Sequence, residues 1–242
     1  MGISHIKVYE ITRRFMFKKP SRIIPKNYRN ITGKFSSNKS DRLISYESKL
    51  ERDFLYIFEL ENLIIKIIEQ PTTIKYLIDE KEYRYTPDFY LQTPDGHNDM
   101  IIEVKYKNEL QKKFKELKPK FKAIIYQLKD KNIDFYLFTD TCTYIRSDEY
   151  KFNVHFLINY NDCDTEHFRI IKDLFFPYIT IDDLLNKFSN DRFKQFVILN
   201  TLWCMIRRKI LIVDMYEKLT TSTELIKFQN YETNIKKGKY LS

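Results

Sequence analysis

The chain is poor in glycine, cysteine and long apolar runs, and each scarcity excludes a class of protein. Only four of its 242 residues are glycine and no glycine-rich phosphate loop occurs, which excludes a nucleotide-binding P-loop. The three cysteines, Cys142, Cys163 and Cys204, lie far apart without C-x-x-C spacing. Cys163 and His167 are close in sequence, but two potential ligands do not make a zinc site. We therefore expect buried or unreactive thiols.

Long apolar runs are missing as well. No run reaches the roughly 18 residues that cross a bilayer, and the N-terminus lacks the apolar region of a signal peptide. These absences predict a soluble, cytoplasmic protein without a membrane partner. Hydrophobic residues still make up 43% of the chain and aromatic residues 16%, which is enough for a sizeable core in one large or two small domains.

Acidic residues are scarce in one region, the first 42 residues. This segment has 11 Lys and Arg against Glu10 and Asp41, a net charge of +9. The whole chain has 42 Lys and Arg against 33 Asp and Glu, so the remaining 200 residues balance at 31 against 31. A basic N-terminal arm (residues 1–42) suits a partner made of phosphates, and a solvated tail is the alternative.

Two extended runs, Tyr83–Gln92 and Met100–Lys107, are joined by a polar turn and predict a β-hairpin. Side chains alternate along a strand, so Glu103 and Lys105 share one face. Asp88 directly follows Pro87, which cannot donate to a strand ladder, and pairing is expected to loosen there. The pattern predicts that an Asp, a Glu and a Lys converge on one spot.

Such a convergence suits metal-dependent hydrolysis. Two carboxylates with water and substrate phosphate form the oxygen ligand set that Mg²⁺ prefers. A nearby Lys can orient the attacking water or help to deprotonate it. The alternative is a half-exposed hairpin on which Glu103 and Lys105 simply face solvent.

A helix is predicted from about Leu43 to Glu61, with an apolar stripe formed by Ile44, Phe54, Leu55 and Phe58. Glu51 falls within that stripe, and Glu47 lies one turn before it on the same side. Burying an unpaired carboxylate is costly, so a third acidic ligand or water-orienting group would explain this placement. The alternative is that both acids reach for solvent or a Lys.

The next segment predicts a crossover. A Lys-rich helix over residues 109–129 leads into a strand over residues 133–139. Strand, helix and strand in this order imply that the Glu103 strand and the later strand pair in parallel. Neighbouring elements would then cover both faces of the Glu103 strand, which disfavours the alternative in which Glu103 and Lys105 face solvent.

The pattern changes from about Asp148. Helices are predicted over residues 165–176, 181–188 and 191–209, with Thr180 and Asp183 as a capping box, followed by a strand over residues 210–214. Short helix, longer helix, strand and turn is the order of a winged helix, a docking module for nucleic acids or proteins. A plain helical cap on the first domain is the alternative.

Five short motifs in this order resemble a known family. They are Ser48-Lys49-Leu50-Glu51, Glu69-Gln70, Thr86-Pro87-Asp88-Phe89, Glu103-Val104-Lys105 and the run FYLFTD at residues 135–140. Together they resemble the TnsA-like endonuclease subunit of heteromeric cut-and-paste transposases, which has the PD-(D/E)xK nuclease fold. The resemblance covers about residues 43–140, and a winged-helix-like tail fits the C-terminal domain of that family.

The resemblance implies an α/β fold, with a restriction-endonuclease-like mixed sheet flanked by helices and a small winged-helix-like C-terminal domain. The implied division is a basic arm (1–42), a nuclease domain (43–147) and a C-terminal domain (148–242). The implied catalytic set is Glu51, Asp88, Glu103 and Lys105. Asp88 and Glu103 would bind Mg²⁺, for which Mn²⁺ could substitute. Glu47 and Gln70 are possible auxiliary residues.

The implied function is hydrolysis of the 5′ strand ends of a transposon in double-stranded DNA. The implied partners are an integrase-type transposase subunit, which cuts the 3′ ends, and an AAA+ ATPase regulator, which docks on the C-terminal region. The implied location is the cytoplasm of a bacterium, at the nucleoid. A free-standing restriction or repair nuclease and a non-catalytic DNA-binding or scaffold protein of the same fold are the alternatives.

Overall fold

The computed structural model describes residues 7–8, 32–129 and 131–229, and the chain divides into two compact units. The N-terminal unit comprises Met1–Leu55 and Leu63–Cys142, and the C-terminal unit comprises Tyr56–Asn62 and Thr143–Ser242. Most of the predicted basic arm, residues 1–6 and 9–31, lies outside the described residues. Within the described residues, no helix is both long and apolar enough to cross a membrane.

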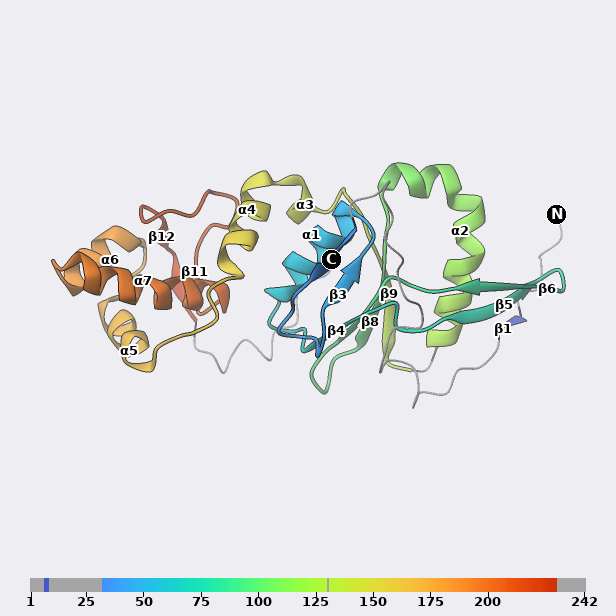
Figure 1. Cartoon of the computed structure of the whole chain (residues 1–242), viewed down its shortest axis with the longest axis horizontal. Helices are drawn as coiled ribbons and strands as arrows, with labels where there is room; N and C mark the ends of the chain where they lie inside the picture. The colour runs from blue at the N-terminus through green and yellow to red at the C-terminus, as the bar shows by residue number, and fades with distance from the viewer. Residues whose placement is uncertain (1–6, 9–31, 130, 230–242) are drawn as a thin grey trace. The chain divides into compact units, whose positions relative to one another are not determined.

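A four-stranded mixed sheet forms the centre of the N-terminal unit (Figure 1). Its strands, in spatial order, are β4 (Lys66–Glu69), β7 (Phe89–Gln92), β8 (Asp99–Val104) and β9 (Ile133–Phe138). The first three are antiparallel neighbours, and β8 pairs with β9 in parallel. The predicted crossover between these two strands is confirmed, and it runs through the helix α2 (Lys107–Leu128).

The predicted single strand over Tyr83–Gln92 is wrong, because this run contributes to two sheets. Its start belongs to β6 (Lys81–Tyr85), which pairs with β5 (Ile74–Ile78), and β5 in turn pairs with β1 (Lys7–Val8). Pro87 separates β6 from β7, since a residue without N–H cannot continue the ladder.

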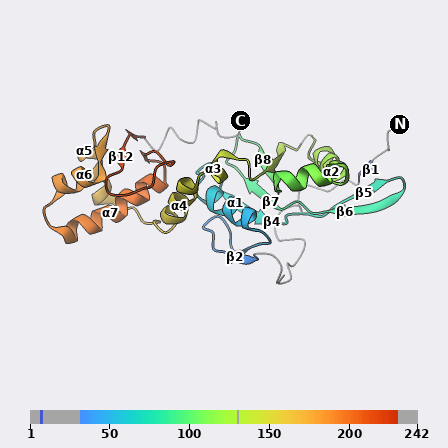
Figure 2. The same ribbon diagram turned by 90° about the horizontal axis from the view of Figure 1, so that it is seen from above.

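The β5–β6 hairpin turns at Asp79 and Glu80, whose φ angles are 48° and 65°. Two consecutive positive φ values are typical of the type I′ turn that matches the twist of antiparallel strands. The hairpin runs alongside α2 and beyond it, as the two views of Figures 1 and 2 agree. Pro119 lies inside α2, where it removes one backbone donor, and Figure 1 shows the helix bent.

The predicted helix from Leu43 begins later than expected. Helix α1 is Lys49–Glu59, and the preceding residues form β3 (Ile44–Tyr46), which pairs with β2 (Gly33–Phe35). Ser48 sets the start, because its Oγ accepts the N–H of Glu51 at 3.1 Å. The helix-period stripe could not distinguish these two structures, since Ile44 is buried in either.

Helices α1 and α2 supply apolar contacts to the central sheet. Phe54 of α1 stacks on Phe89 with ring centroids 4.9 Å apart and meets Phe138 edge-on at 5.1 Å. A second cluster joins α2 to the sheet and to the β5–β6 hairpin. It includes Tyr76, Tyr85, Ile101, Leu117, Phe121 and Ile124, all buried.

The C-terminal unit is mostly helical. Its helices are α3 (Thr143–Arg146), α4 (Asp148–Leu157), α5 (Thr165–Leu174), α6 (Ile181–Phe188) and α7 (Arg192–Arg207). The predicted capping box of α6 is confirmed: Thr180 Oγ1 accepts the N–H of Asp183 at 3.0 Å and donates to its carboxylate at 2.8 Å. Helix α5 is capped by Asp164, which accepts the N–H of His167 at 2.8 Å.

Short strands complete this unit. β10 (Ile179–Thr180) pairs with β12 (Glu224–Leu225), and β11 (Leu211–Ile212) pairs with β13 (Lys227–Phe228). Only Ile226 separates β12 from β13, and its N–H donates to the carbonyl of Ile212 at 2.8 Å. The two ladders therefore meet along one nearly continuous strand.

The expectation of three separate thiols is wrong for two of them. Cys163 and Cys204 form a disulfide between the segment before α5 and the buried side of α7, with Cα atoms 5.6 Å apart. Their sequence separation of 41 residues conceals this pairing, because the return of α7 to the start of α5 is a tertiary feature. Cys142 stays a free, half-buried thiol.

Candidate active site

The candidate site lies where β7 begins and β8 ends. Glu69 pairs with Phe89, and Phe89 pairs with Ile102. One residue further along, the same register brings Gln70 and Glu103 to either side of Asp88. The N–H of Gln70 donates to the carbonyl of Asp88 at 2.7 Å, which holds these two residues together at the backbone.

The structure brings Asp88, Glu103 and Lys105 together, as the strand pattern predicts. Lys105 Nζ lies 3.2 Å from Glu103 Oε1 and 3.8 Å from Asp88 Oδ2. The Glu103 side chain is 4% exposed, whereas those of Asp88 and Lys105 are 20% and 23% exposed. A small ligand can thus reach Asp88 and Lys105 from solvent, and Glu103 forms the floor of the site.

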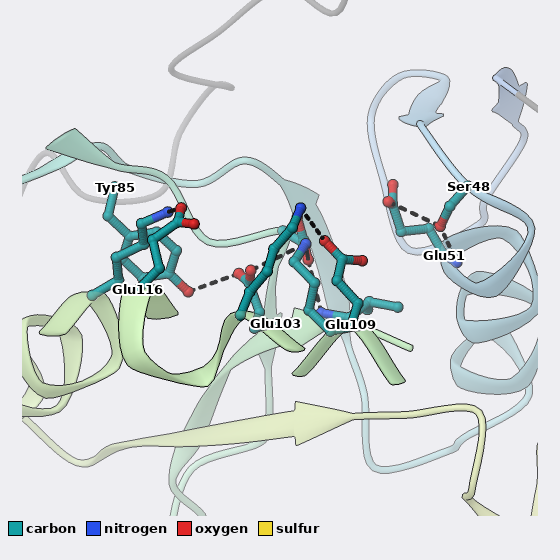
Figure 3. Close-up of polar contacts among 11 residues, drawn as sticks. Ser48, Glu51, Tyr85, Glu103, Glu109 and Glu116 are labelled. Atoms are coloured by element: carbon teal, nitrogen blue, oxygen red, sulfur yellow. Dashed lines mark hydrogen bonds and ion pairs between the residues drawn. The ribbon is translucent and has the colours of Figure 1, made fainter. Parts of the chain in front are cut away.

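Both carboxylates are held by further donors. Asp88 Oδ2 accepts the N–H of Val104 at 2.7 Å. The hydroxyl of Tyr85 donates to Glu103 Oε2 at 2.7 Å, in a buried contact that Figure 3 draws. Tyr85 was not among the predicted site residues. Tyr85 lies only three residues before Asp88, and this proximity could have suggested a role in the site. Its strand, β6, belongs to the other sheet, so the strand pattern did not place it there.

Burial shifts the proton affinities of the site. It raises the pKa of Asp88 to about 7, an effect that the charge of Glu103 increases and that of Lys105 opposes. Burial also raises the pKa of Glu103, against the influence of Lys105 and the Tyr85 hydrogen bond. Burial by itself would lower the pKa of Lys105, but Asp88 and Glu103 raise it well above its usual range. Asp88 and Glu103 thus favour the charged, ammonium form of Lys105.

Glu51 is part of the cap of α1. Its carboxylate accepts the N–H of Glu47 at 2.7 Å and the hydroxyl of Ser48 at 3.0 Å. Burial, followed by the charge of Asp88, raises the pKa of Glu51 to about 7. Glu51 is thus within electrostatic reach of Asp88, although Figure 3 draws it with Ser48 apart from Glu103.

Glu47 and Gln70, the two predicted auxiliary residues, act on the site in different ways. The charge of Glu47 contributes to the raised pKa of Asp88, so this carboxylate also acts on the site electrostatically. Gln70 contributes its backbone: its N–H donates to the carbonyl of Asp88, and its φ of 44° is a left-handed conformation. A residue at a strand end with this conformation costs about 1 kcal/mol or more, so the position has to be fixed by its surroundings.

Helix α2 borders the site. The charge of Lys120 lowers the pKa of Glu103, and that of Glu109 raises the pKa of Lys105. These α2 residues belong to ion pairs of their own: Glu109 with Lys113 at 3.3 Å and Glu116 with Lys120 at 3.1 Å (Figure 3). Sequence periodicity alone did not indicate this electrostatic role of the helix.

The donor set fits a hard divalent cation. In the part of the chain that the structure describes, no group of three or more His, Cys, Asp or Glu is arranged to hold a metal. Asp88 and Glu103 nevertheless provide two oxygen donors, and Mg²⁺ commonly uses one or two carboxylates with water and substrate phosphate. Burial raises the pKa of both carboxyls, and the positive charge of a bound cation would oppose that shift.

A family comparison agrees with this geometry. Residues 61–140 match the family model described as TnsA-like endonuclease N terminal. This segment is therefore similar to a TnsA-like endonuclease domain. It contains Asp88, Glu103 and Lys105, whereas Glu51 precedes the matched residues. The mixed sheet of the TnsA-like domain fits a nuclease fold, and the family implies nuclease activity with a role in transposition. No curated protein sequence matches the chain.

Proposed function

We propose that this chain is the DNA endonuclease subunit of a multi-protein transposase and that it hydrolyses the 5′ strand ends of the transposon with Mg²⁺. The observation that supports this most is the convergence of Asp88, Glu103 and Lys105 within the TnsA-like domain. Its expected partners are double-stranded transposon ends and an integrase-type transposase subunit that cuts the 3′ ends. Its expected place is the bacterial nucleoid.

Each site residue has a distinct role in this proposal. Asp88 and Glu103 would hold Mg²⁺, or Mn²⁺ in its place, which would supply Lewis-acid stabilisation of the phosphodiester. Lys105, charged at neutral pH, stabilises the negative charge that develops at the phosphate. Glu51, with a pKa of about 7, accepts the proton that the attacking water loses. Val104 and Tyr85 fix the orientation of the two carboxylates.

The variant Asp88→Ala tests the metal site. It should lose Mg²⁺ and Mn²⁺ binding in calorimetry and lose cleavage of duplexes that carry transposon ends, assayed with the partner proteins. Its circular dichroism spectrum should match that of the wild type. Asp95→Ala is the matched control, because Asp95 is an exposed carboxylate in the turn before β8. Unchanged metal binding in Asp88→Ala would refute this assignment.

We also propose that the C-terminal unit is a winged-helix-like docking module for an AAA+ ATPase regulator. Its support is the order α6, α7, β11, β13, together with the pairing of β10 and β12. Helix α7 exposes aromatic side chains: Phe193 is 76% and Phe196 is 72% exposed. Exposed aromatic residues are typical of protein-binding surfaces, whereas a helix that reads DNA is rich in polar and basic groups.

The full-length double variant Phe193→Ala/Phe196→Ala tests this docking function. It should no longer retain the regulator in a pull-down, while the chain keeps its metal binding. Phe152→Ala is the control, because Phe152 is 50% exposed on α4 of the same unit. Equal retention of the regulator by both variants would contradict docking through α7.

A further inference from the structure

Glu69 is a buried carboxylate that has no role in the proposed chemistry. It is the last residue of β4, and its side chain is 5% exposed. Burial raises the pKa of Glu69, and the positive charge of Arg42 opposes this shift. A carboxylate in such a place destabilises the fold unless its contacts compensate for the lost water. The contacts of Glu69 therefore indicate what it does.

β4 is an outer strand of the central sheet, and residues 39–48 lie against it as an edge segment. The N–H of Ile67 donates to the carbonyl of Lys39 at 2.9 Å. Lys66 Nζ lies 3.2 Å from Asp41 Oδ2. The first part of the edge segment is thus attached to the first half of β4.

The carboxylate of Glu69 holds the next part of the edge segment. Arg42 Nη2 lies 2.9 Å from Glu69 Oε2. The backbone N–H of Ser45 also donates to the carboxylate of Glu69, which lowers its pKa. Ser45 is the middle residue of β3, so the contact fixes that short strand against the end of β4.

The edge segment ends at the two residues that hold Glu51. The N–H of Glu47 donates to Glu51 Oε2 at 2.7 Å, and the hydroxyl of Ser48 donates to Glu51 Oε1 at 3.0 Å. Only one residue separates Ser45 from Glu47. A displacement of Ser45 would therefore also displace the N–H that holds Glu51.

Gln70, the second residue of the same sequence motif, contacts the other half of the site. Its N–H donates to the carbonyl of Asp88 at 2.7 Å. Two consecutive residues thus contact the segment that holds Glu51 and the residue that would bind the metal. The charge of Asp88 raises the pKa of Glu51, so the placement of these two carboxylates affects their proton affinities.

We infer that Glu69 is a positioning residue, which sets the place of Glu51 relative to Asp88 by holding the edge segment against β4. It acts through Arg42 and Ser45, not on the substrate. The inference rests on the proposed function, in which Glu51 accepts the proton of the attacking water. Loss of the Glu69 charge should therefore impair proton transfer more than metal binding.

The variant Glu69→Gln tests this role in the full chain, because Gln keeps the size of the side chain and removes the charge that pairs with Arg42. The hydrogen bonds from Glu47 and Ser48 lower the pKa of Glu51, so weakening them should raise it by about 0.5 to 1 unit. Carboxyl ¹³C NMR in EDTA measures this pKa, and the resonance is assigned by its loss in Glu51→Gln.

The pH dependence of cleavage provides a second measurement. At saturating Mg²⁺, the rising part of the pH–rate profile of Glu69→Gln should move to higher pH by the same amount. The cleavage rate at pH 6 should then fall roughly three- to tenfold further than the rate at pH 9. A purely structural role would lower the rate by one factor at all pH values.

Asp99→Asn is the matched control. Asp99 lies at the start of β8, at the opposite end of that strand from Glu103, and accepts the N–H of Thr93 at 2.9 Å. The control thus removes another carboxylate that fixes backbone in the same sheet, and it should leave the pKa of Glu51 unchanged. An unchanged pKa in Glu69→Gln overturns the inference, and so does an equal shift in Asp99→Asn.

A second variant and a comparison with cleavage complete the test. If Glu69→Gln does not fold, Arg42→Gln removes the other partner of the ion pair and should raise the pKa of Glu51 in the same direction. If this pKa rises but the wild type cleaves no transposon end, the proposed function fails and the positioning role stands. If the wild type cleaves and neither variant moves the pKa, only the positioning role fails.

Discussion

Tyr85 and Glu103 are joined across two sheets by a buried 2.7 Å hydrogen bond. Tyr85 donates to Oε2 of the carboxylate, whereas Oε1 faces Lys105 at 3.2 Å. Each carboxylate oxygen thus has a separate partner, which fixes the rotation of the carboxylate about its last bond. The β5–β6 hairpin therefore helps to define the geometry of a site that the central sheet carries.

Tyr85→Phe should weaken cleavage about tenfold, because Glu103 loses the donor that orients it. The lost buried hydrogen bond should also lower the free energy of unfolding by about 1–2 kcal/mol. The informative measurement is the dependence of cleavage rate on Mg²⁺ concentration, whose midpoint should rise. A variant that only loosens the fold would leave that midpoint unchanged. Tyr83→Phe is the control, since Tyr83 is 37% exposed and stacks on Tyr76.

Glu51 and Glu47 are distinguished by a pair of Gln variants. Glu51→Gln should reduce cleavage a hundredfold or more, because Gln cannot accept a proton. Its effect on stability should stay below about 1 kcal/mol, since Gln can serve in the capping box with Ser48. Glu47→Gln should leave most of the activity. If Glu47→Gln abolishes cleavage and Glu51→Gln does not, the roles of the two residues are reversed.

The raised pKa of Asp88 predicts that the metal-free protein loses stability as pH rises. Its pKa is about 7 in the folded chain and 3.8 when unperturbed, so folding favours the protonated form. This contribution is present in full below pH 4 and is lost as pH rises through 7. In EDTA, the free energy of unfolding should therefore fall between pH 5 and pH 8 by roughly 2 kcal/mol more in the wild type than in Asp88→Asn. Urea titrations at both pH values measure the difference, and parallel curves would contradict the shift.

The disulfide predicts a redox-sensitive stability of the C-terminal unit. A thiol titration of the oxidised, denatured chain should find one reactive cysteine, Cys142, and three after reduction. Cys163→Ser should destabilise this unit by about 4 kcal/mol, the loop-closure value for a crosslink of this span. Cys142→Ser should leave the effect of dithiothreitol on unfolding as it is in the wild type. Three reactive thiols in the oxidised chain would show that the bond does not form.

Most of the central site could be predicted because its signals are local. The strand period placed Glu103 and Lys105 on one face, and the Pro87-Asp88 step marked the end of a ladder. The crossover between β8 and β9 followed from the order of apolar patterns. The roles of Glu51, Asp88, Glu103 and Lys105 in catalysis stay predictions.

The features that the sequence did not reveal depend on tertiary structure. Tyr85 reaches Glu103 from another sheet, and nothing in the aromatic run 83–92 shows where one sheet ends and the next begins. The start of α1 depended on Ser48, because a buried Ile44 suits both a strand and a helix. The link from Cys163 to Cys204 depends on how α5 packs against α7.

A substitution in the turn of the β5–β6 hairpin should increase the stability of this protein. Asp79 and Glu80 both have positive φ angles, which glycine adopts more easily, and the chain contains only four glycines. A side chain beyond Cα makes that conformation cost about 1 kcal/mol or more, which a glycine avoids. Glu80→Gly would create the Asp-Gly pair preferred in type I′ turns. It should raise the free energy of unfolding by about 0.5 kcal/mol, after the larger entropy of the unfolded chain is subtracted. Thermostability could thus be raised at the hairpin tip without altering any group of the candidate active site.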